Sequence, residues 1–199
     1  MSCGREGQVV AGLTGGIACG KSAAAEIMGR NGWEVVSTDA LAGQVLAEDE
    51  GVKEAVRSEF GAEVFLEEGT IDKGRLGGLV FVSPSKRRWL EELLHPLIRK
   101  EWLQATRTAK ANRVVVEIPL LYEKKLESEF DFVLSVYAHQ RTQMHRLHER
   151  GLSEEESSGR LAAQLPAGEK ASRADHVLLG EGTLPWLAHQ MERLLPALS

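Results

Sequence analysis

Short apolar runs alternate with stretches rich in helix-forming residues over the first and last parts of the chain. Brief buried runs bounded by turn residues are typical of strands in a parallel sheet, and the stretches between them are typical of helices. The predicted strands are Gln8–Leu13, Trp33–Ser37, Arg113–Ile118, Asp131–Tyr137 and His176–Leu179. The predicted helices around them are Lys21–Arg30, His139–Arg150, Ser153–Gln164 and a last one from Thr183 to about Leu195. This order predicts an α/β fold with a doubly wound parallel sheet.

The middle of the chain differs, because residues 40–112 carry helical patterns without a convincing core strand. The predicted helices there are Ala40–Glu48, Val52–Phe60, Arg75–Val82, Pro84–Leu94 and one from about Leu97, with an interruption at His95-Pro96. A stretch this long exceeds a simple crossover and predicts a helical insertion beside the sheet. We therefore divide the chain into a core, residues 8–39 and 113–199, and an insertion, residues 40–112.

Composition narrows the compartment and the partners. The formal net charge of −5 argues against a nucleic-acid-binding surface, which is usually basic. The two cysteines, Cys3 and Cys19, do not suggest a disulfide framework and favour a reducing setting. The first residues lack the apolar centre of a signal peptide, and no run of about 18 apolar residues predicts a membrane span. We expect a soluble, cytoplasmic protein with no nucleic acid and no membrane as partner.

The stretch Gly12–Ser22 (GLTGGIACGKS) matches the phosphate-binding loop pattern G-x-x-x-x-G-K-[ST] between a predicted strand and a predicted helix. Glycines let backbone N–H groups approach a polyphosphate closely, and the helix beginning near Lys21 adds free N–H groups and its positive dipole end. We expect Lys21 to bridge the outer phosphates and the Ser22 hydroxyl to reach Mg²⁺. The residues expected to bind the nucleotide are Gly15, Gly16, Ile17, Ala18, Cys19, Gly20, Lys21, Ser22 and Ala23.

Asp39 follows the second predicted strand, at the sheet edge where open α/β folds place their ligands. Phosphoryl transfer needs an oriented acceptor, and a carboxylate here is suited to orient and deprotonate an acceptor hydroxyl. Aspartate is also a common N-cap, so a structural role at the start of the helix Ala40–Glu48 is an equal alternative from spacing alone.

Glu117 ends an apolar strand and is a candidate to hold the water shell of Mg²⁺, as an acidic residue does in many phosphate-loop enzymes. Ser22 is the other candidate for that ion. The alternative for Glu117 is a structural carboxylate at the end of a strand.

Arg146 and Arg150 lie four residues apart on one face of a basic helix, which a capped acidic helix follows. Two guanidinium groups there would grip a transferring phosphate as residues 141–165 close over the site as a lid. The alternative is a solvated basic face paired with neighbouring glutamates.

Two further side chains have competing interpretations. Cys19 lies in the loop at a helix N-terminus beside Lys21, which predicts a lowered thiol pKa and a reactive side chain when the site is empty. His95 precedes Pro96 and is either a ligand contact or a structural histidine. No spacing of His and Cys predicts a metal site built from those residues.

Several segments, in order and with similar spacing, together resemble the dephospho-CoA kinase family, which phosphorylates the ribose 3′-hydroxyl of dephospho-CoA with ATP. The resemblance runs from about Val9 to Asp175. Its segments are Gly12–Ser22, Asp39 with Ala40 and Ala42, Gly69–Asp72, Leu94–Ile98, Glu117–Glu123, Gln143, Arg146, Arg150, Gln164, Glu169-Lys170 and Ala174-Asp175. The loop (LTGGI) and the segment IPLLYE are specific in combination.

This resemblance implies a nucleotide-binding core of the P-loop NTPase type, a helical CoA-side insertion and a lid. It also implies ATP and Mg²⁺ as cofactors and dephospho-CoA as a small-molecule substrate. The catalytic base falls on Asp39, the lid arginines on Arg146 and Arg150, and the acceptor side on His95, Pro119 and Leu120.

The chain departs from the family pattern inside the loop and near its end. Ala18-Cys19 stands where Gly-Ser is usual, Ala23 where Thr is usual, Lys73 where Arg is common, and Gly180 near a usual Asn. Ala18 matters most, because its Cβ narrows the backbone conformations that the loop can use.

Two other functions compete with this one. Another P-loop small-molecule kinase, such as a nucleoside monophosphate kinase, would share the core and the lid and differ in the acceptor pocket. A non-catalytic nucleotide-binding subunit would keep the loop but need neither Asp39 nor the arginine pair. A switch GTPase is disfavoured, because the sequence lacks an N-K-x-D motif.

Overall fold

The computed structural model describes residues 3–198 and contains a five-stranded sheet in the order β2-β3-β1-β4-β5, with every pair of neighbours parallel. The strands are β1 (Val9–Gly15), β2 (Glu34–Ser37), β3 (Arg113–Glu117), β4 (Phe132–Tyr137) and β5 (His176–Leu179). The predicted doubly wound parallel sheet is confirmed. Nearly all of β1, β3 and β4 is buried, as expected for parallel strands covered on both faces.

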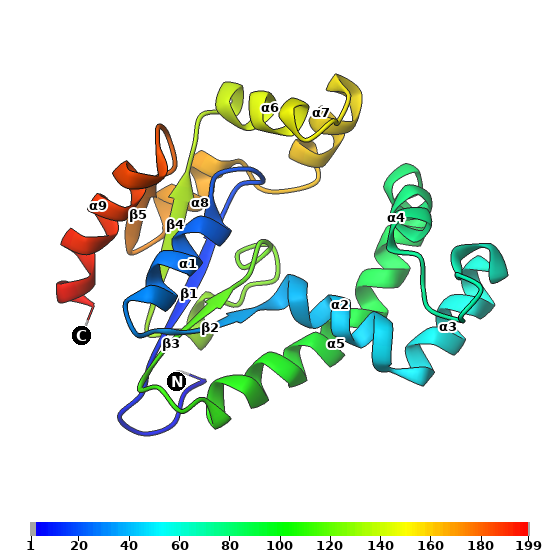
Figure 1. The fold of residues 1–199 in the computed structure, drawn as a ribbon, viewed down its shortest axis with the longest axis horizontal. Helices are drawn as coiled ribbons and strands as arrows, with labels where there is room; N and C mark the ends of the chain where they lie inside the picture. The colour runs from blue at the N-terminus through cyan, green and yellow to red at the C-terminus, as the bar shows by residue number, and fades with distance from the viewer. Residues whose placement is uncertain (1–2, 199) are drawn as a thin grey trace. The chain divides into compact units, whose positions relative to one another are not determined.

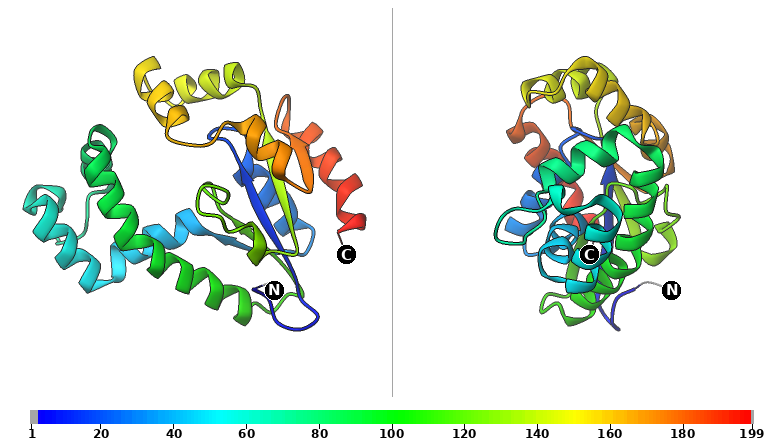
Figure 2. Two further views of the ribbon diagram at one scale, coloured as in Figure 1. Left: turned by 180° about the vertical axis from the view of Figure 1, so that it is seen from behind. Right: turned by 90° about the vertical axis from the view of Figure 1, so that its right-hand side faces the viewer.

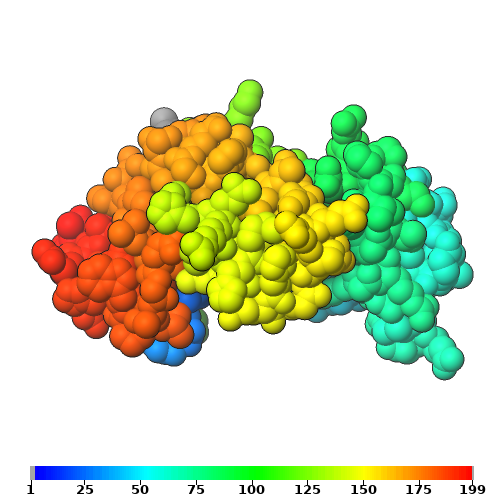
Figure 3. All heavy atoms as spheres, turned by 90° about the horizontal axis from the view of Figure 1, so that it is seen from above, coloured from blue at the N-terminus to red at the C-terminus, as the bar shows by residue number. Residues whose placement is uncertain are grey.

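Helices cover both faces of this sheet (Figures 1 and 2). On one face, α1 (Lys21–Arg30) packs beside α9 (Leu184–Leu194) in a core that includes Met28, Leu187 and Met191. On the other face lies α8 (Ala167–Arg173), which contacts β1 and β4. Two helices follow β4, α6 (Gln140–Glu149) and α7 (Glu154–Ala162), and Figure 3 shows their atoms on the outer surface. Ser153 and Glu156 form a capping box that opens α7.

The strand register brings the ends of β1, β2 and β3 together at the carboxyl edge of the sheet. Glu117, the last residue of β3, pairs with Leu13 on one side and with Ser37 on the other. Near the starts of the strands, two aspartate side chains accept hydrogen bonds from amides of neighbouring strands. Asp131 accepts from the Val10 amide at 2.7 Å, and Asp175 accepts from the Val133 amide at 2.7 Å. The loops that leave β1, β2 and β3 therefore begin at one edge of the sheet.

Residue contacts divide the chain into two units, one holding the chain up to Ser37 and from Ala105 onward, and the other holding Thr38–Gln104. The second unit contains α2 (Thr38–Glu48), α3 (Glu50–Phe60), α4 (Lys73–Val82) and most of α5 (Pro84–Thr108). Its own core includes Val56, Phe60 and Leu94. Asp49 and Asp72 cap α3 and α4 by accepting from backbone amides of the first turn.

The predicted interruption at His95-Pro96 is wrong, because α5 runs unbroken through Pro96. A proline removes one hydrogen bond, here to the carbonyl four residues earlier, at Glu92. Both Glu92 and Pro96 are exposed, so water can satisfy that carbonyl. Solvent therefore removes much of the penalty that usually ends a helix at proline.

The sequence reading missed α8, which has seven residues and no side-chain cap at Pro166. Its helical state comes from packing against the sheet rather than from a local signal. Among the described residues, no helix combines the length and the apolar character needed to cross a membrane.

Candidate active site

The phosphate-binding loop follows β1 and leads into α1. Gly15 and Gly20 have φ angles of 144° and 102°, and a Cβ on Gly15 would lie 2.3 Å from the Val136 carbonyl oxygen. Only glycine fits there. Within residues 3–198, the backbone amides of Ile17, Ala18 and Gly20 donate to no protein acceptor, so they are available to an anion.

Ala18 adopts the left-handed conformation, with a φ of 58°. That conformation costs a residue with a Cβ about 1–2 kcal/mol, which glycine would not pay. The loop nevertheless keeps this geometry. A hydrogen bond from the Arg146 guanidinium to the Ala18 carbonyl compensates part of the strain.

Lys21 curls back over the loop, where its Nζ donates to the carbonyl oxygens of Gly15 at 3.2 Å and Gly16 at 2.9 Å. The Ser22 hydroxyl donates to Oε1 of the buried Glu117 at 3.0 Å. A hydroxyl and a carboxylate are oxygen ligands of the type that Mg²⁺ prefers, and that ion commonly uses only one or two protein groups besides phosphates and waters. The described residues contain no cluster of three or more His, Cys, Asp or Glu side chains suited to a metal.

Arg146 is directed at the loop from α6. Its guanidinium donates to the carbonyl oxygens of Ala18 at 3.0 Å and Gly180 at 2.7 Å. Arg150, one turn later at the C-terminal end of α6, is exposed. The structure thus gives the two predicted lid arginines different surroundings.

Gly180 lies near a position where the family pattern usually has asparagine. In this chain, a steric constraint explains why the residue is glycine. A Cβ there would lie 1.9 Å from the Cys19 carbonyl oxygen. The segment after β5 therefore packs directly against the phosphate-binding loop.

The predicted low pKa of Cys19 is wrong. The side chain is fully buried, and burial raises the pKa of the thiol, outweighing the lowering effect of Lys21. Sequence placed the sulfur near a helix N-terminus but gave no information on its exclusion from water. Cys19 serves the loop through its backbone and as a small packed side chain.

We expect the native protein to react slowly with iodoacetamide at neutral pH, because neither Cys19 nor Cys3 is exposed and burial raises the pKa of Cys3 to about 11. Peptide mass spectrometry after timed labelling measures this. Denatured protein is the control and should label rapidly at both positions. Rapid labelling of Cys19 in the native protein would contradict the buried geometry.

Glu181 caps α6 from the neighbouring loop. Its carboxylate accepts from the backbone amide of His139 and from the Thr142 hydroxyl, and the first of these bonds is the main cause of its lowered pKa. The His139 side chain makes no capping hydrogen bond of its own. The base of the predicted lid is thereby tied to the loop that carries Gly180.

Glu181→Gln should lower the unfolding free energy by about 1 kcal/mol at neutral pH, because a hydrogen bond to a charged acceptor is stronger by about that amount than one to a neutral acceptor. A carboxyl whose folded pKa lies below its unfolded value stabilises the fold above the unfolded pKa. That stability is lost as pH falls through the folded pKa. The difference between wild type and variant in urea unfolding should therefore shrink below pH 4. A pH-independent difference would exclude the carboxylate as its source.

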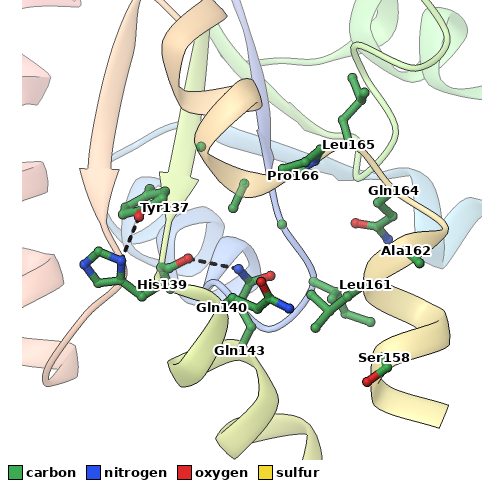
Figure 4. Close-up of a pocket in the computed structure, with 15 residues that line it drawn as sticks. Tyr137, His139, Gln140, Gln143, Ser158, Leu161, Ala162, Gln164, Leu165 and Pro166 are labelled. Atoms are coloured by element: carbon green, nitrogen blue, oxygen red, sulfur yellow. Dashed lines mark hydrogen bonds between the residues drawn. The ribbon is translucent and has the colours of Figure 1, made fainter. Parts of the chain in front are cut away.

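A cavity of about 680 Å³ lies between the loop and α7 (Figure 4). Its lining includes Gly16, Leu161 and Leu165, with the amides of Gln143 and Gln164. The Gln143 amide nitrogen donates to the Ala138 carbonyl, and the buried amide oxygens of both glutamines have no hydrogen-bond partner among residues 3–198. Such atoms cost about 1–3 kcal/mol when left unpaired, so they are suited to accept from a bound molecule.

The remaining predicted residues are placed by different elements. Asp39 is the second residue of α2, two positions beyond the end of β2, and is exposed. It does not occupy the N-cap position, which contradicts the capping alternative. His95 lies within α5 of the second unit. Pro119 and Leu120 are half-buried in the turn directly after β3.

Three polar residues near Pro119 were not singled out as site residues. The Pro119 carbonyl accepts from the Thr14 hydroxyl at 3.3 Å and from Lys170 Nζ at 2.6 Å, and Lys170 also pairs with Glu123. The available signal for Lys170 was its place in the Glu169-Lys170 segment of the family resemblance. It could not be used without the helix α8, which the sequence did not reveal.

Comparison with known proteins gives one consistent result. The family model for dephospho-CoA kinase matches residues 9–185. A dephospho-CoA kinase from Enterococcus faecalis is 40% identical over 189 residues, covering 94% of this chain and 95% of the relative. A Thermus thermophilus protein of known structure has a TM-score of 0.79 at 34% identity, covering 96% of this chain and 98% of that one. The dephospho-CoA kinase from Campylobacter jejuni has a TM-score of 0.67 at 27% identity, with coverages of 97% and 98%.

Proposed function

The chain belongs to the dephospho-CoA kinase family, and from that premise we propose that it transfers the γ-phosphoryl group of ATP to the ribose 3′-hydroxyl of dephospho-CoA. The products are CoA and ADP, so the reaction is the last step of coenzyme A biosynthesis. The observation that carries the proposal is the family match across the phosphate-binding loop and the strand that ends at Glu117. Phosphoryl transfer mainly requires positioning and charge stabilisation, which this edge of the sheet is built to supply.

On the donor side, the amides of Ile17, Ala18 and Gly20 and the Lys21 ammonium are proposed to bind the phosphates of ATP. Ser22 and Glu117 are proposed to hold Mg²⁺, directly or through its waters. When bound, the ion neutralises charge on the outer phosphates. Lys21 would leave the carbonyls of Gly15 and Gly16 to follow the phosphate charge.

On the acceptor side, Asp39 is proposed to orient the 3′-hydroxyl and accept its proton. Its exposed carboxylate makes no hydrogen bond or ion pair with other described residues, so it is free to accept from a substrate. His95, Pro119 and Leu120 are proposed to contact the remainder of dephospho-CoA. Arg146 and Arg150, on the proposed lid of residues 141–165, are assigned to the transferring phosphoryl group.

We also propose a cytoplasmic setting and no nucleic-acid partner. Cys3 and Cys19 are both free and buried, as in proteins of reducing compartments, and the net charge is −5.

The test is a coupled assay of ADP formation with Mg²⁺-ATP and separate acceptors: dephospho-CoA, AMP, CMP and UMP. We expect strong stimulation by dephospho-CoA, with CoA identified by mass spectrometry, and loss of activity on chelation of Mg²⁺. Stimulation by a nucleoside monophosphate alone would favour that kinase class. The absence of any acceptor-dependent turnover would favour a non-catalytic nucleotide-binding subunit.

A further inference from the structure

Lys170 is a lysine without solvent exposure, on the inner face of α8. Its Nζ donates to Glu123 Oε1 at 2.8 Å and to the Pro119 carbonyl oxygen at 2.6 Å. Desolvating an ammonium and a carboxylate costs several kcal/mol per ion, and their mutual attraction often only offsets that cost. A gain in stability is therefore a weak explanation for the buried pair.

The same two acceptors connect other parts of the site. Glu123 Oε1 also accepts from the Leu165 backbone amide at 2.9 Å, in the segment between α7 and α8. The Pro119 carbonyl also accepts from the fully buried Thr14, which directly precedes the phosphate-binding loop. The turn after β3 is thus bonded to three other segments: to the end of β1 through Thr14, to the chain that leaves α7 through Leu165, and to α8 through Lys170.

In the turn after β3, side chains hold the Pro119 carbonyl. The ladder with β1 continues to Ile118, whose amide donates to the Leu13 carbonyl at 2.9 Å. Pro119 then ends it, because proline has no amide hydrogen to donate. Beyond that point, the direction of the Pro119 carbonyl is set by side chains, and this peptide lies two residues past Glu117, the carboxylate bonded to Ser22.

We propose that Lys170 is a positioning residue for phosphoryl transfer, which holds the Pro119–Glu123 turn in register with the phosphate-binding loop and with the end of α7. The proposal rests on the proposed dephospho-CoA kinase activity, since this turn carries the assigned acceptor contacts Pro119 and Leu120. Displacing reacting groups by about 1 Å can cost roughly 10²-fold in rate. Lys170 touches neither substrate in this assignment and acts through the backbone it holds.

The test compares Lys170→Met with the double variant Lys170→Met/Glu123→Gln, in which the glutamine amide oxygen still offers an acceptor to the Leu165 amide. The single variant leaves the half-buried carboxylate of Glu123 without its cation and is expected to lose stability. The double variant removes both charges, which commonly restores stability to a buried site. Each variant is characterised by its melting temperature, its Kd for ATP, and kcat and KM for dephospho-CoA.

We expect the folded double variant to bind ATP within about twofold of wild type. Its kcat/KM for dephospho-CoA should fall by roughly 10- to 100-fold, in proportion to the lost positioning. Ser172→Ala is the control on the same helix, because Ser172 is exposed and its hydroxyl donates to the Glu169 carbonyl within α8 at 2.9 Å. Its kinetic constants should stay near those of wild type.

A stable double variant with wild-type kcat/KM would overturn the proposal and leave the pair with a purely structural role. Lys170→Arg keeps the charge and the donors, and partial recovery of kcat/KM relative to Lys170→Met is expected. No difference between the arginine and methionine variants would also contradict it. If wild type does not phosphorylate dephospho-CoA, the proposed function fails separately, and the same comparison is made with the acceptor that wild type does phosphorylate.

Discussion

Asp39→Asn is expected to lower kcat for dephospho-CoA by about 10²–10⁴-fold, the usual contribution of a general base. Asparagine keeps the size of the side chain and loses the charge that orients and deprotonates the acceptor hydroxyl. Because Asp39 is exposed and is separate from the phosphate-binding loop in sequence, the Kd for ATP and the melting temperature should change little. Steady-state kinetics, ATP titration and thermal unfolding of the same preparation measure all three.

The structural alternative makes a different prediction at this position. A carboxylate in the first turn of α2 interacts favourably with the helix dipole by about 0.3–1 kcal/mol. Under that role, Asp39→Ala would lower stability slightly and leave kcat unchanged. Asp49→Ala is the matched control, since Asp49 caps α3 by accepting from the Val52 amide at 2.9 Å. It should lose about 1 kcal/mol of stability and keep its turnover. Wild-type turnover by Asp39→Asn would exclude the base assignment.

The sequence predicted the sheet well because its strands are short, apolar and buried, so periodicity and burial agree. The strand His176–Leu179 and the helix Lys21–Arg30 were predicted with the bounds that the structure shows. The phosphate-binding loop was recognisable for a related reason. Its glycines are required by the local backbone conformation, for example the φ of 144° at Gly15. A requirement of this local kind can be recognised from the neighbouring residues alone.

What the sequence could not provide depends on contacts between distant segments. The fully buried thiol of Cys19 depends on packing around the loop, which no neighbouring letter reports. The continuation of α5 through Pro96 depends on which face of the helix meets water. From the sequence alone, Lys170 resembles an ordinary surface lysine. In the structure its position on α8 places it against Pro119 and Glu123, which lie about fifty residues earlier in the chain.

Arg146 is the other residue at which a large effect is expected. Its guanidinium spans the carbonyls of Ala18 and Gly180 at 3.0 and 2.7 Å, so it fastens the strained part of the loop to the segment after β5. A contact made to the phosphoryl group in the transition state would add a second role. Arg146→Ala should therefore lower kcat by about 10²-fold, equivalent to about 2.7 kcal/mol. It should also raise the Kd for ATP by a smaller factor of roughly tenfold, since a hydrogen bond from a charged donor to the loop is lost.

Measuring kcat and the Kd for ATP separately distinguishes these roles. A raised Kd for ATP with wild-type kcat would show that Arg146 only stabilises the conformation of the loop. A lowered kcat with wild-type Kd would show that it acts only by contacting the transition state. Arg146→Lys sharpens the comparison, because a single ammonium lacks the planar fork of donors that reaches two carbonyls at once. Arg141→Ala, an exposed arginine on the same helix, is the control and should match wild type. If Arg146→Ala and Arg141→Ala behave alike in both measurements, the basic face of α6 is solvated surface, and the lid assignment of residues 141–165 loses its chemical basis.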